Sequence, residues 1–453
     1  MTITINITRG DQAIAFADDA EFLEKWKSLA CKTPHKTTFQ QPDFVVQWGK
    51  IYRDTFELII VNAYSNSGEL VGLMPLALRM SNHILTHAGS QLAEYSGWLS
   101  LPWQNKSFLL AALKAIKTNI TFSKWEWTYI APGTDTSWFE SDDFKDEHIY
   151  ISHQTIESPL LDLHNEDKLR KVLKNKSVKS KINRLKRKGE LRIERITQKK
   201  RALDLMDQVT DLVNFRHESA HNDAAFEEDQ QQRSFYGSRC DDLENNHFSV
   251  LWMGEKLLAF HFGRLEKDCL HLGLSAFDPT ESKHSPGVIF LIYLANLLKE
   301  ENIRYIDLTP GGDQYKERFS NAHNTLHIAE FYFSKAQFKK ILIRQSVKSA
   351  ALNFLSLCNI DKHEIKDLFR KKETSATLNK HEISLYICHI NKPDNKPSNP
   401  VDNVNIQKYS DLLSYTKNQI FKRQQLLEDA TFRFSREETL FSIVCNSELS
   451  AYA

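Results

Sequence analysis

The segment from Leu270 to Lys316 constrains the fold more than any other part of the chain. Leu270–Phe277 (LHLGLSAF) alternates in the manner of a half-buried strand, and Val288–Leu298 (VIFLIYLANLL) is apolar on nearly every helical face. A second short strand follows and ends at Asp307. Because so apolar a helix must lie against a sheet, the segment predicts a βαβ unit with polar residues at its strand ends.

Ser285, Pro286 and Gly287 form the turn that opens the apolar helix. Proline suits the first helical turn, where its missing N–H costs nothing, and glycine lets a ligand approach the backbone closely. The free N–H groups and the helix dipole at such a turn favour an anion by about 0.3 to 1 kcal/mol. The turn is therefore predicted to hold a phosphate or a pyrophosphate.

The composition indicates a folded protein of more than one domain. The chain has 453 residues, of which 41% are hydrophobic and 26% charged, and this length exceeds one ordinary core. No apolar run reaches the roughly 20 residues that span a bilayer, and the N-terminus lacks the pattern of a signal peptide, so we expect a cytoplasmic protein. The six cysteines show no CxxC spacing, which argues against a zinc ribbon or a disulfide framework.

A basic run covers Lys168–Arg201, although the net charge of the chain is only +1. Its apolar residues fall at helical spacing, which predicts one basic amphipathic helix ending near Gly189. Four interpretations remain open: a solvated helix face, a contact for coenzyme phosphates, a peripheral contact with an anionic glycan or lipid surface, or an RNA contact. The run has no aromatic residue, which counts against nucleic-acid binding by base stacking.

One hairpin pattern occurs three times, in Glu57–Leu76, His247–Phe262 and Leu440–Ala453. Each reads as a strand, a short polar turn and a returning strand, in which an apolar residue stands two places before a small one. Three hairpins with one offset indicate related modules in series.

We therefore predict an α/β protein built from modules. The first module is residues 1–165, and the second, complete module is residues 166–345. A helical extension (346–390) and a linker rich in Pro and Asn (391–405) follow. A partial module (406–453) lacks an expected fourth strand, which suggests either completion by a partner or truncation of the module.

The second module resembles the GNAT acyltransferase superfamily. The resemblance is carried by the order of its elements, by the turn Ser285–Gly287 and by Asp307–Lys316 (DLTPGGDQYK), and the early hairpin of the first module with GELVGLMPL adds to it. More narrowly, these segments resemble the cellulose-biosynthesis CelD-like branch, which is similar in layout to Fem-type peptidyltransferases. The resemblance covers about residues 20 to 335 and implies tandem GNAT-like (acyl-CoA N-acyltransferase) domains, with mixed sheets flanked by helices.

The resemblance also implies an activity: transfer of an acyl group, in particular acetyl, from acyl-CoA to an amine or a hydroxyl without a metal. The implied acceptor is a small molecule, a sugar, or a precursor of the cell envelope or of a polysaccharide. Such chemistry needs a donor to the thioester carbonyl, a base for the nucleophile, an acid for the thiolate and a pyrophosphate cradle.

By this resemblance, the coenzyme-binding residues are Leu274, Ser275, Ala276, Ser285, Gly287 and Val288. Tyr315 would protonate the departing thiolate, and Asp307 or His271 would accept the proton of the nucleophile. Structural alternatives remain open for these three residues: an anchor of the turn for Tyr315, a carboxylate that caps a loop for Asp307, and an ordinary sheet histidine for His271. Pro310 stands where many members of the branch carry Arg, so the role of that Arg is unfilled.

His217, Glu218 and His221 spell HExxH, which on a helix would bind zinc with Glu218 as the base of a metallopeptidase. The neighbouring residues are polar and no clear third ligand follows, so this interpretation is the weaker one. We expect instead that Arg216, His217 and Glu218 line the acceptor cleft, and that Lys316 also binds the substrate or anchors its turn.

Two rival functions keep the fold. A Fem-like transferase would take its acyl group from aminoacyl-tRNA and would use the basic run as an RNA contact. A non-catalytic scaffold would keep the modules only for binding. The sequence shows no long inserted coiled coil, which counts against the first rival.

Overall fold

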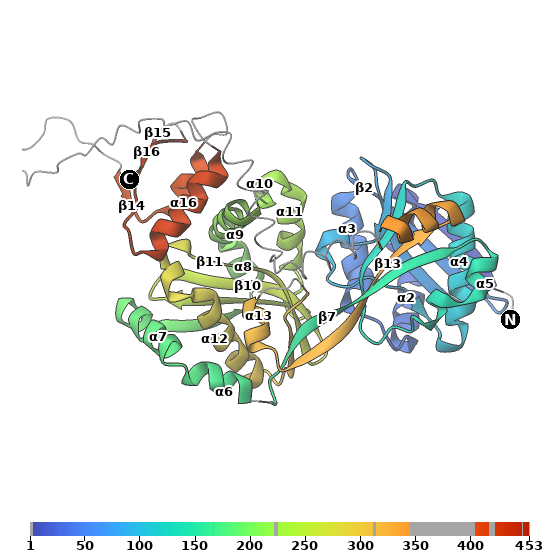
Figure 1. Cartoon of the computed structure of the whole chain (residues 1–453), viewed down its shortest axis with the longest axis horizontal. Helices are drawn as coiled ribbons and strands as arrows, with labels where there is room; N and C mark the ends of the chain where they lie inside the picture. The colour runs from blue at the N-terminus through green and yellow to red at the C-terminus, as the bar shows by residue number, and fades with distance from the viewer. Residues whose placement is uncertain are drawn as a thin grey trace, which may run out of the picture. The chain divides into compact units, whose positions relative to one another are not determined.

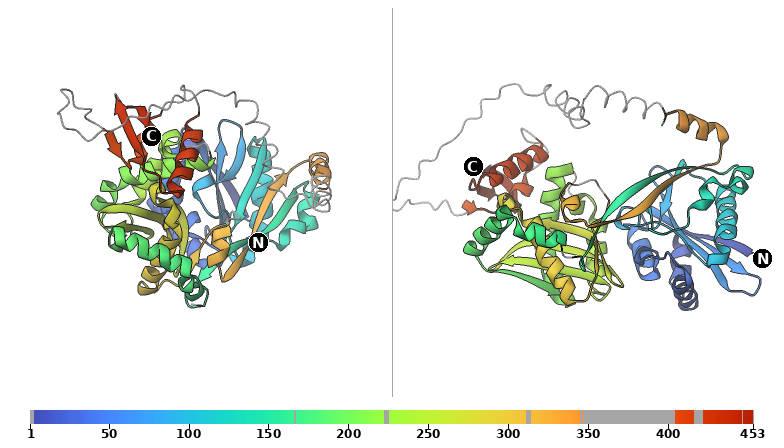
Figure 2. Two further views of the ribbon diagram at one scale, coloured as in Figure 1. Left: turned by 60° about the vertical axis from the view of Figure 1, so that its left-hand side comes forward. Right: turned by 60° about the horizontal axis from the view of Figure 1, so that its bottom comes forward.

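The structure is a computed structural model (Figures 1 and 2). It describes residues 3–165, 167–221, 225–310, 314–344, 346, 404–415, 422–445 and 447–452. The chain divides into two compact units, Met1–Phe331 together with Asn403–Ala453, and Tyr332–Asp402. In the second unit residues 335–344 are helical, whereas most of the predicted helical extension and linker lie outside the described residues.

The first part of the larger unit alternates short helices with strands. Its main elements are β1 (Ile3–Arg9), α1 (Gly10–Ala17), α2 (Ala20–Lys32), η1 (Thr38–Gln40), α3 (Pro42–Tyr52), β2 (Phe56–Ser65), β3 (Leu70–Arg79), β4 (Ile84–His87), β5 (Leu99–Ser100), α4 (Asn105–Asn119), β6 (Lys124–Ile130), α5 (Asp142–Asp146) and β7 (Tyr150–Asp162).

The second part begins with the basic run and contains the predicted βαβ unit. Its elements are α6 (Asp167–Lys174), α7 (Lys176–Lys188), β8 (Leu191–Ile196), α8 (Lys199–Asp204), α9 (Met206–His221), α10 (Ala225–Glu228), α11 (Gln230–Arg239), β9 (Asn246–Met253), β10 (Lys256–Glu266), β11 (Cys269–Phe277), η5 (Pro279–His284), α12 (Pro286–Glu300), β12 (Tyr305–Asp307), α13 (Gln314–Phe319) and β13 (Ala322–Tyr332).

The C-terminal elements belong to the same unit. They are β14 (Val404–Ile406), η6 (Tyr409–Ser414), α16 (Arg423–Ser435), β15 (Phe441–Cys445) and β16 (Glu448–Tyr452).

Several local predictions are confirmed. The three hairpins pair antiparallel, as β2–β3, β9–β10 and β15–β16. Strands β11 and β12 are parallel and α12 connects them, with Pro286 in its first turn. The single basic helix is wrong, because Asn175 ends α6 and caps α7: its side chain accepts a hydrogen bond from Ser177 N at 2.9 Å.

Within the described residues, 13 strands form one mixed sheet, and its main path runs β1-β2-β3-β4-β6-β13-β7-β12-β11-β10-β9-β8. Strands from the two parts exchange places at its centre. β13, the last strand of the second part, pairs with β6, where Ala329 faces Trp127. β7, the last strand of the first part, pairs with β12, where Leu161 faces Ile306. Strands β7 and β13 are neighbours in the sheet and run side by side (Figure 1). The sheet therefore runs without a break from one part to the other.

Apolar clusters cover both faces of strands β9 to β11. On one face, Ala259 and Leu270 pack with the apolar side of α12, including Leu294. On the other face, Phe260 packs with the apolar side of α9, including Val213. Each fully buried Leu, Val or Phe side chain in these clusters contributes about 1.5 to 3 kcal/mol. The strands between these layers are consequently fixed on both faces.

The C-terminal elements pack on α9. Leu427 and Phe434 of α16 share a buried cluster with Phe215 of α9. The Arg423 side chain is 5% exposed and pairs with Glu218 of α9 at 2.7 Å and with Glu227 of α10 at 2.6 Å. These contacts join the C-terminal elements to the second part of the larger unit.

Candidate active site

Beyond His271, strand β11 has a neighbour among the described strands on one side only, and we call this part, as far as Phe277, the one-sided stretch. Strand β11 pairs with β12 over Cys269–His271, and β12 ends at Asp307. On its other side β11 pairs with β10 as far as Phe277, opposite Ala259. Among the described residues no strand pairs with the β12 side beyond His271. Unpaired backbone groups there are available to a ligand, since such groups need partners when buried.

A β-bulge lies at the start of this stretch. Phe262 faces Leu274 and Arg264 faces His271, so Leu272 and Gly273 lie opposite the single residue Gly263. A Cβ on Gly263 would lie 2.1 Å from the carbonyl oxygen of His271, and a Cβ on Gly273 would lie 2.8 Å from that of Phe262. Both positions therefore require glycine, and the bulge redirects the backbone at the point where the two parallel strands separate.

The turn that opens α12 lies at the other end of the stretch. A Cβ on Gly287 would lie 3.4 Å from the ring of Phe277. The N–H of Ser285 donates to Ser282 and that of Val288 donates to Ser285. Of the three amides predicted to bind phosphate, only that of Gly287 is without a partner among the described residues. Ser285 itself has a positive φ of 53°, which is uncommon for a residue with a side chain.

Helix α7 brings positive charge to this turn. Lys181 Nζ donates to Ser285 Oγ at 2.7 Å, and Lys188 Nζ donates to Glu281 of η5 at 2.7 Å. Leu185 anchors the helix in the core that α12 also covers. Among the four interpretations of the basic run, this position favours a contact for coenzyme phosphates.

Asp307 is the centre of a buried polar cluster beside the bulge. Its Oδ2 accepts hydrogen bonds from the Tyr95 hydroxyl and from His271 Nδ1, the latter at 3.1 Å, and its Oδ1 accepts one from Thr309 N at 2.9 Å. Burial alone would raise the pKa of Asp307, but the hydrogen bonds and the charge of His271 outweigh it and lower that pKa. Asp307 is consequently an anion whose oxygens already have partners.

His271 lies between two carboxylates. Its Nε2 is 3.5 Å from Glu266 Oε2, on the side of the ring opposite Asp307. Burial would lower the pKa of His271, but hydrogen bonding to Asp307 and Glu266 outweighs burial and raises the pKa to about 9. At neutral pH His271 is therefore an imidazolium. Its predicted role as a proton acceptor stays a prediction that must be weighed against this charge.

Glu94 is a candidate that the sequence did not reveal. It borders a small cavity of about 30 Å³ next to His271, Gly273 and Tyr236, which we call the inner cavity. Burial first, and then the charge of Asp307, raise the pKa of Glu94 to about 7, whereas His271 and Lys316 act in the opposite direction. Glu94 and Tyr95 belong to the first part of the chain, in a segment (SQLAEYSGW) with no motif to mark it.

Of the two site residues predicted after β12, the structure describes the side chain of Lys316 but not that of Tyr315. Lys316 is 9% exposed, and its Nζ donates to Thr309 O at 3.3 Å and to Thr309 Oγ1 at 3.2 Å. Thr309 has a φ of 59°, a strained value for a β-branched residue, so Lys316 and Asp307 both hold a strained turn. Tyr315 falls in α13, but its side chain lies outside the described residues.

Helix α9 carries the HExxH pattern and Arg216. Arg216 Nη1 donates to the backbone oxygen of Ser275 and, at 3.0 Å, to its Oγ, so Arg216 lies on the one-sided stretch of β11. The carboxylate of Glu218 instead accepts from Arg423 Nε at 2.7 Å. The side chain of His221 lies outside the described residues, and His217 stays a predicted ligand of the acceptor. In the described part of the chain, no group of three or more His, Cys, Asp or Glu is placed to hold a metal ion.

A family model described as "Acetyltransferase (GNAT) domain" matches residues 173–317. This segment contains the bulge, the turn and the polar residues of β11 and β12. Residues 173–317 form a GNAT domain. The resemblance to the superfamily is thus confirmed, whereas the CelD-like branch stays a prediction. No curated protein matches the chain significantly.

Solved structures similar to this chain include tandem GNAT proteins. A tandem GNAT protein from the clavulanic acid biosynthesis pathway is 13% identical, with 72% of this chain and 98% of that chain covered and a TM-score of 0.44. A conserved protein of unknown function from Bacteroides thetaiotaomicron is 12% identical, with 68% and 97% covered and a TM-score of 0.45. FemX is 9% identical, with 70% and 98% covered and a TM-score of 0.39.

None of the described helices is both long and apolar enough to cross a membrane.

Proposed function

We propose that this protein transfers an acyl group, in particular acetyl, from acyl-CoA to an amine or a hydroxyl. The observation that carries the proposal is the one-sided stretch of β11, with the α12 turn at one end and the polar cluster at the other. From His271 to Phe277 the stretch spans about 20 Å, at roughly 3.3 Å per residue. That length is of the order of the extended arm between the pyrophosphate and the sulfur of coenzyme A.

The residues of the stretch fit such a coenzyme. The amide of Gly287, the dipole of α12 and Lys181 would hold the pyrophosphate, because all three bring positive charge to one turn. The backbone of Leu274 to Ala276 would bind the pantetheine arm. Arg216, which now donates to the Ser275 carbonyl, would have to release that oxygen or share it.

The proton transfers can be assigned to residues near the inner cavity. We assign Glu94 as the acceptor of the proton that the nucleophile loses, because a general base works best with a pKa close to the operating pH. The new bond forms between the nucleophile and the acyl carbon, the C–S bond breaks, and the thiolate takes a proton. The resemblance assigns that second proton to Tyr315. Asp307 and His271 fix the geometry of the bulge and set the local charge.

The nature of the acceptor and the cellular compartment go beyond what the GNAT domain match gives. We infer that the acceptor is a sugar or another polar precursor of the envelope or of a polysaccharide, and that the protein acts in the cytoplasm. A polar acceptor is supported by the charged and amide side chains that line the inner cavity: Glu94, Arg239, Asn246, Arg264 and His271.

Calorimetric titration with acetyl-CoA and a longer acyl-CoA tests the proposal. We expect saturable binding that Gly287→Glu abolishes, because its carboxylate would lie beside the phosphates. Gly237→Glu on α11 is the matched control, since nothing lies within 4 Å of a Cβ there, and it should bind as the unchanged protein does.

Equal binding by a folded Gly287→Glu variant would remove the cradle from this turn. No binding of either acyl-CoA to the unchanged protein would refute the proposal and would favour an aminoacyl-tRNA donor or a scaffold.

A further inference from the structure

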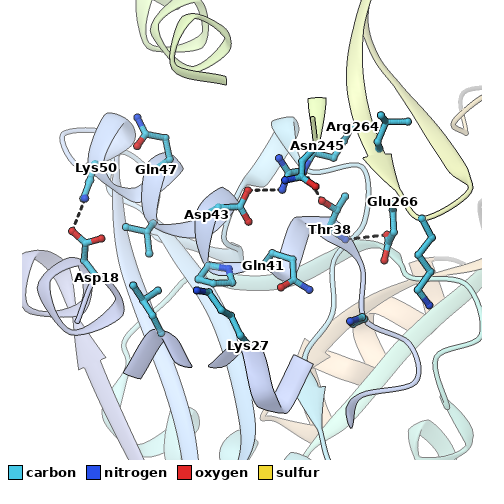
Figure 3. Close-up of a pocket in the computed structure, with 16 residues that line it drawn as sticks. Asp18, Lys27, Thr38, Gln41, Asp43, Gln47, Lys50, Asn245, Arg264 and Glu266 are labelled. Atoms are coloured by element: carbon cyan, nitrogen blue, oxygen red, sulfur yellow. Dashed lines mark hydrogen bonds and ion pairs between the residues drawn. The ribbon is translucent and has the colours of Figure 1, made fainter. Parts of the chain in front are cut away.

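A second, larger pocket lies beside the inner cavity. It has a volume of about 690 Å³ and is lined by α2, η1, α3 and the end of β10 (Figure 3). We call it the outer pocket. Its volume falls within the range of about 300 to 1,000 Å³ that small-molecule sites usually have.

The charged side chains of the outer pocket leave a positive surplus. Five cationic side chains (Lys27, Lys36, Lys50, Arg264 and Lys267) face three carboxylates (Asp18, Asp43 and Glu266). All three carboxylates have partners: Asp18 pairs with Lys50 at 2.6 Å, Asp43 with Arg264 at 2.5 Å, and Glu266 accepts from Thr38 N at 3.0 Å (Figure 3).

Two cations are left over. Lys36 and Lys267 have no side-chain partner among the residues that the structure describes, and Lys27 is bonded only to the exposed Glu24, at 3.0 Å. An anion in the outer pocket would therefore meet uncompensated positive charge without displacing an existing ion pair.

Arg264 borders both the outer pocket and the inner cavity. It is 6% exposed, lines both spaces, and donates to Thr38, Asp43 and Asn246. Arg239, which is 5% exposed, donates to the same Oδ2 of Asp43 at 2.9 Å. Two buried guanidinium groups thus share one carboxylate, and the next acidic group, Asp242, lies 4.0 Å from Arg264. These two arginines thus add buried positive charge to that of the lysines of the outer pocket.

The outer pocket also reaches the polar cluster. Glu266 lines the outer pocket and is the second carboxylate of His271. The inner cavity, with about 30 Å³, has room for little more than an amino or a hydroxyl group. A molecule whose body fills the outer pocket can therefore present only one small group to Glu94.

We propose that the outer pocket binds the acceptor through a phosphate group and directs its amine or hydroxyl into the inner cavity. The phosphate lies near Lys36, Lys267 and Arg264. The acceptor class is then a phosphorylated amine or alcohol, such as an amino sugar phosphate with the phosphate across the ring from the amine. Transfer to this acceptor rests on the proposed function, but its binding does not.

The test is calorimetric titration of the full chain with glucosamine 6-phosphate, glucosamine and inorganic phosphate, with and without saturating acetyl-CoA. We expect glucosamine 6-phosphate to bind at least tenfold more tightly than glucosamine, and acetyl-CoA not to displace it. Lys36→Gln and Lys267→Gln should each weaken binding about threefold, and the double variant about tenfold, because each removes one exposed charge interaction. Lys114→Gln, an exposed lysine on α4, is the control and should bind unchanged.

Three results would overturn the inference: equal affinity for the sugar and its phosphate, unchanged binding by the double variant, or no saturable binding of any probe. Displacement of the sugar phosphate by acetyl-CoA would also overturn it, since the outer pocket would then be a coenzyme site. If the sugar phosphate binds as expected and acyl-CoA does not bind at all, only the proposed function fails.

Discussion

Replacing Arg423 by alanine tests how the C-terminal elements are attached to the GNAT domain. The guanidinium of Arg423 donates to Glu218 at 2.7 Å, and their side chains are 5% and 4% exposed. Its second pair, with Glu227, is more exposed, because the Glu227 side chain is 51% accessible. Most of the effect should therefore come from Glu218, which would lose its cation while buried.

Removing one partner of a buried ion pair usually costs about 3 to 5 kcal/mol, because the other charge stays buried and uncompensated. Arg423 also donates to the Leu413 carbonyl at 2.8 Å, so the variant would also lose this hydrogen bond between α16 and η6. The loss should be local, in α9 and α16. At tenfold for each 1.4 kcal/mol, a cost of 3 kcal/mol corresponds to about a 150-fold larger population of the opened state.

Amide hydrogen exchange measured by mass spectrometry reports this opening segment by segment. We expect peptides from α9 and α16 to exchange about two orders of magnitude faster in Arg423→Ala, whereas peptides from β2 and β3 stay unchanged. Adding Glu218→Gln to Arg423→Ala should restore part of the protection, because the buried charge is gone. Less than a fivefold change in the single variant, or no restoration in the double variant, would refute the argument that this pair holds α16 on α9.

Further predictions concern the polar cluster. Glu94→Gln should lower kcat at least a hundredfold and remove the rise of kcat/KM with pH, because a base with a pKa of about 7 is active only above that pH. If the pH profile of the variant shows the same rise, Glu94 is not the base. The raised pKa of His271, about 9 in place of 6.5, adds stability that is complete below pH 6.5 and is lost as the pH rises through 9. Urea unfolding at pH 6 and at pH 9.5 should therefore show a larger loss of stability in the unchanged protein than in His271→Gln, and equal losses in both would contradict the proposed ion pairs.

Local patterns in the sequence anticipate much of the second part. The alternation of Leu270–Phe277 and the apolar run Val288–Leu298 predict β11 and α12. On the neighbouring strands β11 and β12, His271 Nδ1 and Asp307 Oδ2 lie 3.1 Å apart. Such features depend on residues close together in the chain, so periodicity and turn residues are sufficient to find them.

Contacts between distant segments could not be anticipated in the same way. Tyr95 and Asp307 are 212 positions apart, and Thr38 and Arg264 are 226 apart, so no local pattern joins them. The position of Glu94 beside the inner cavity depends on the packing of the first part against β10 and β11. Its raised pKa is a result of that packing and has no signature in a segment that reads as an ordinary loop.

The exchange of β7 and β13 has a consequence for how the chain is made. β6 has β13 as its neighbour, with Phe331 opposite Trp125, so the first part cannot complete its sheet until the ribosome has synthesised residues up to β13. During that interval β6 presents an open edge that other chains could join. Domains usually fold one after another as they emerge from the ribosome, but neither of these two parts can complete its sheet without strands from the other. The growing chain therefore gains a finished N-terminal sheet only when the GNAT domain is already complete.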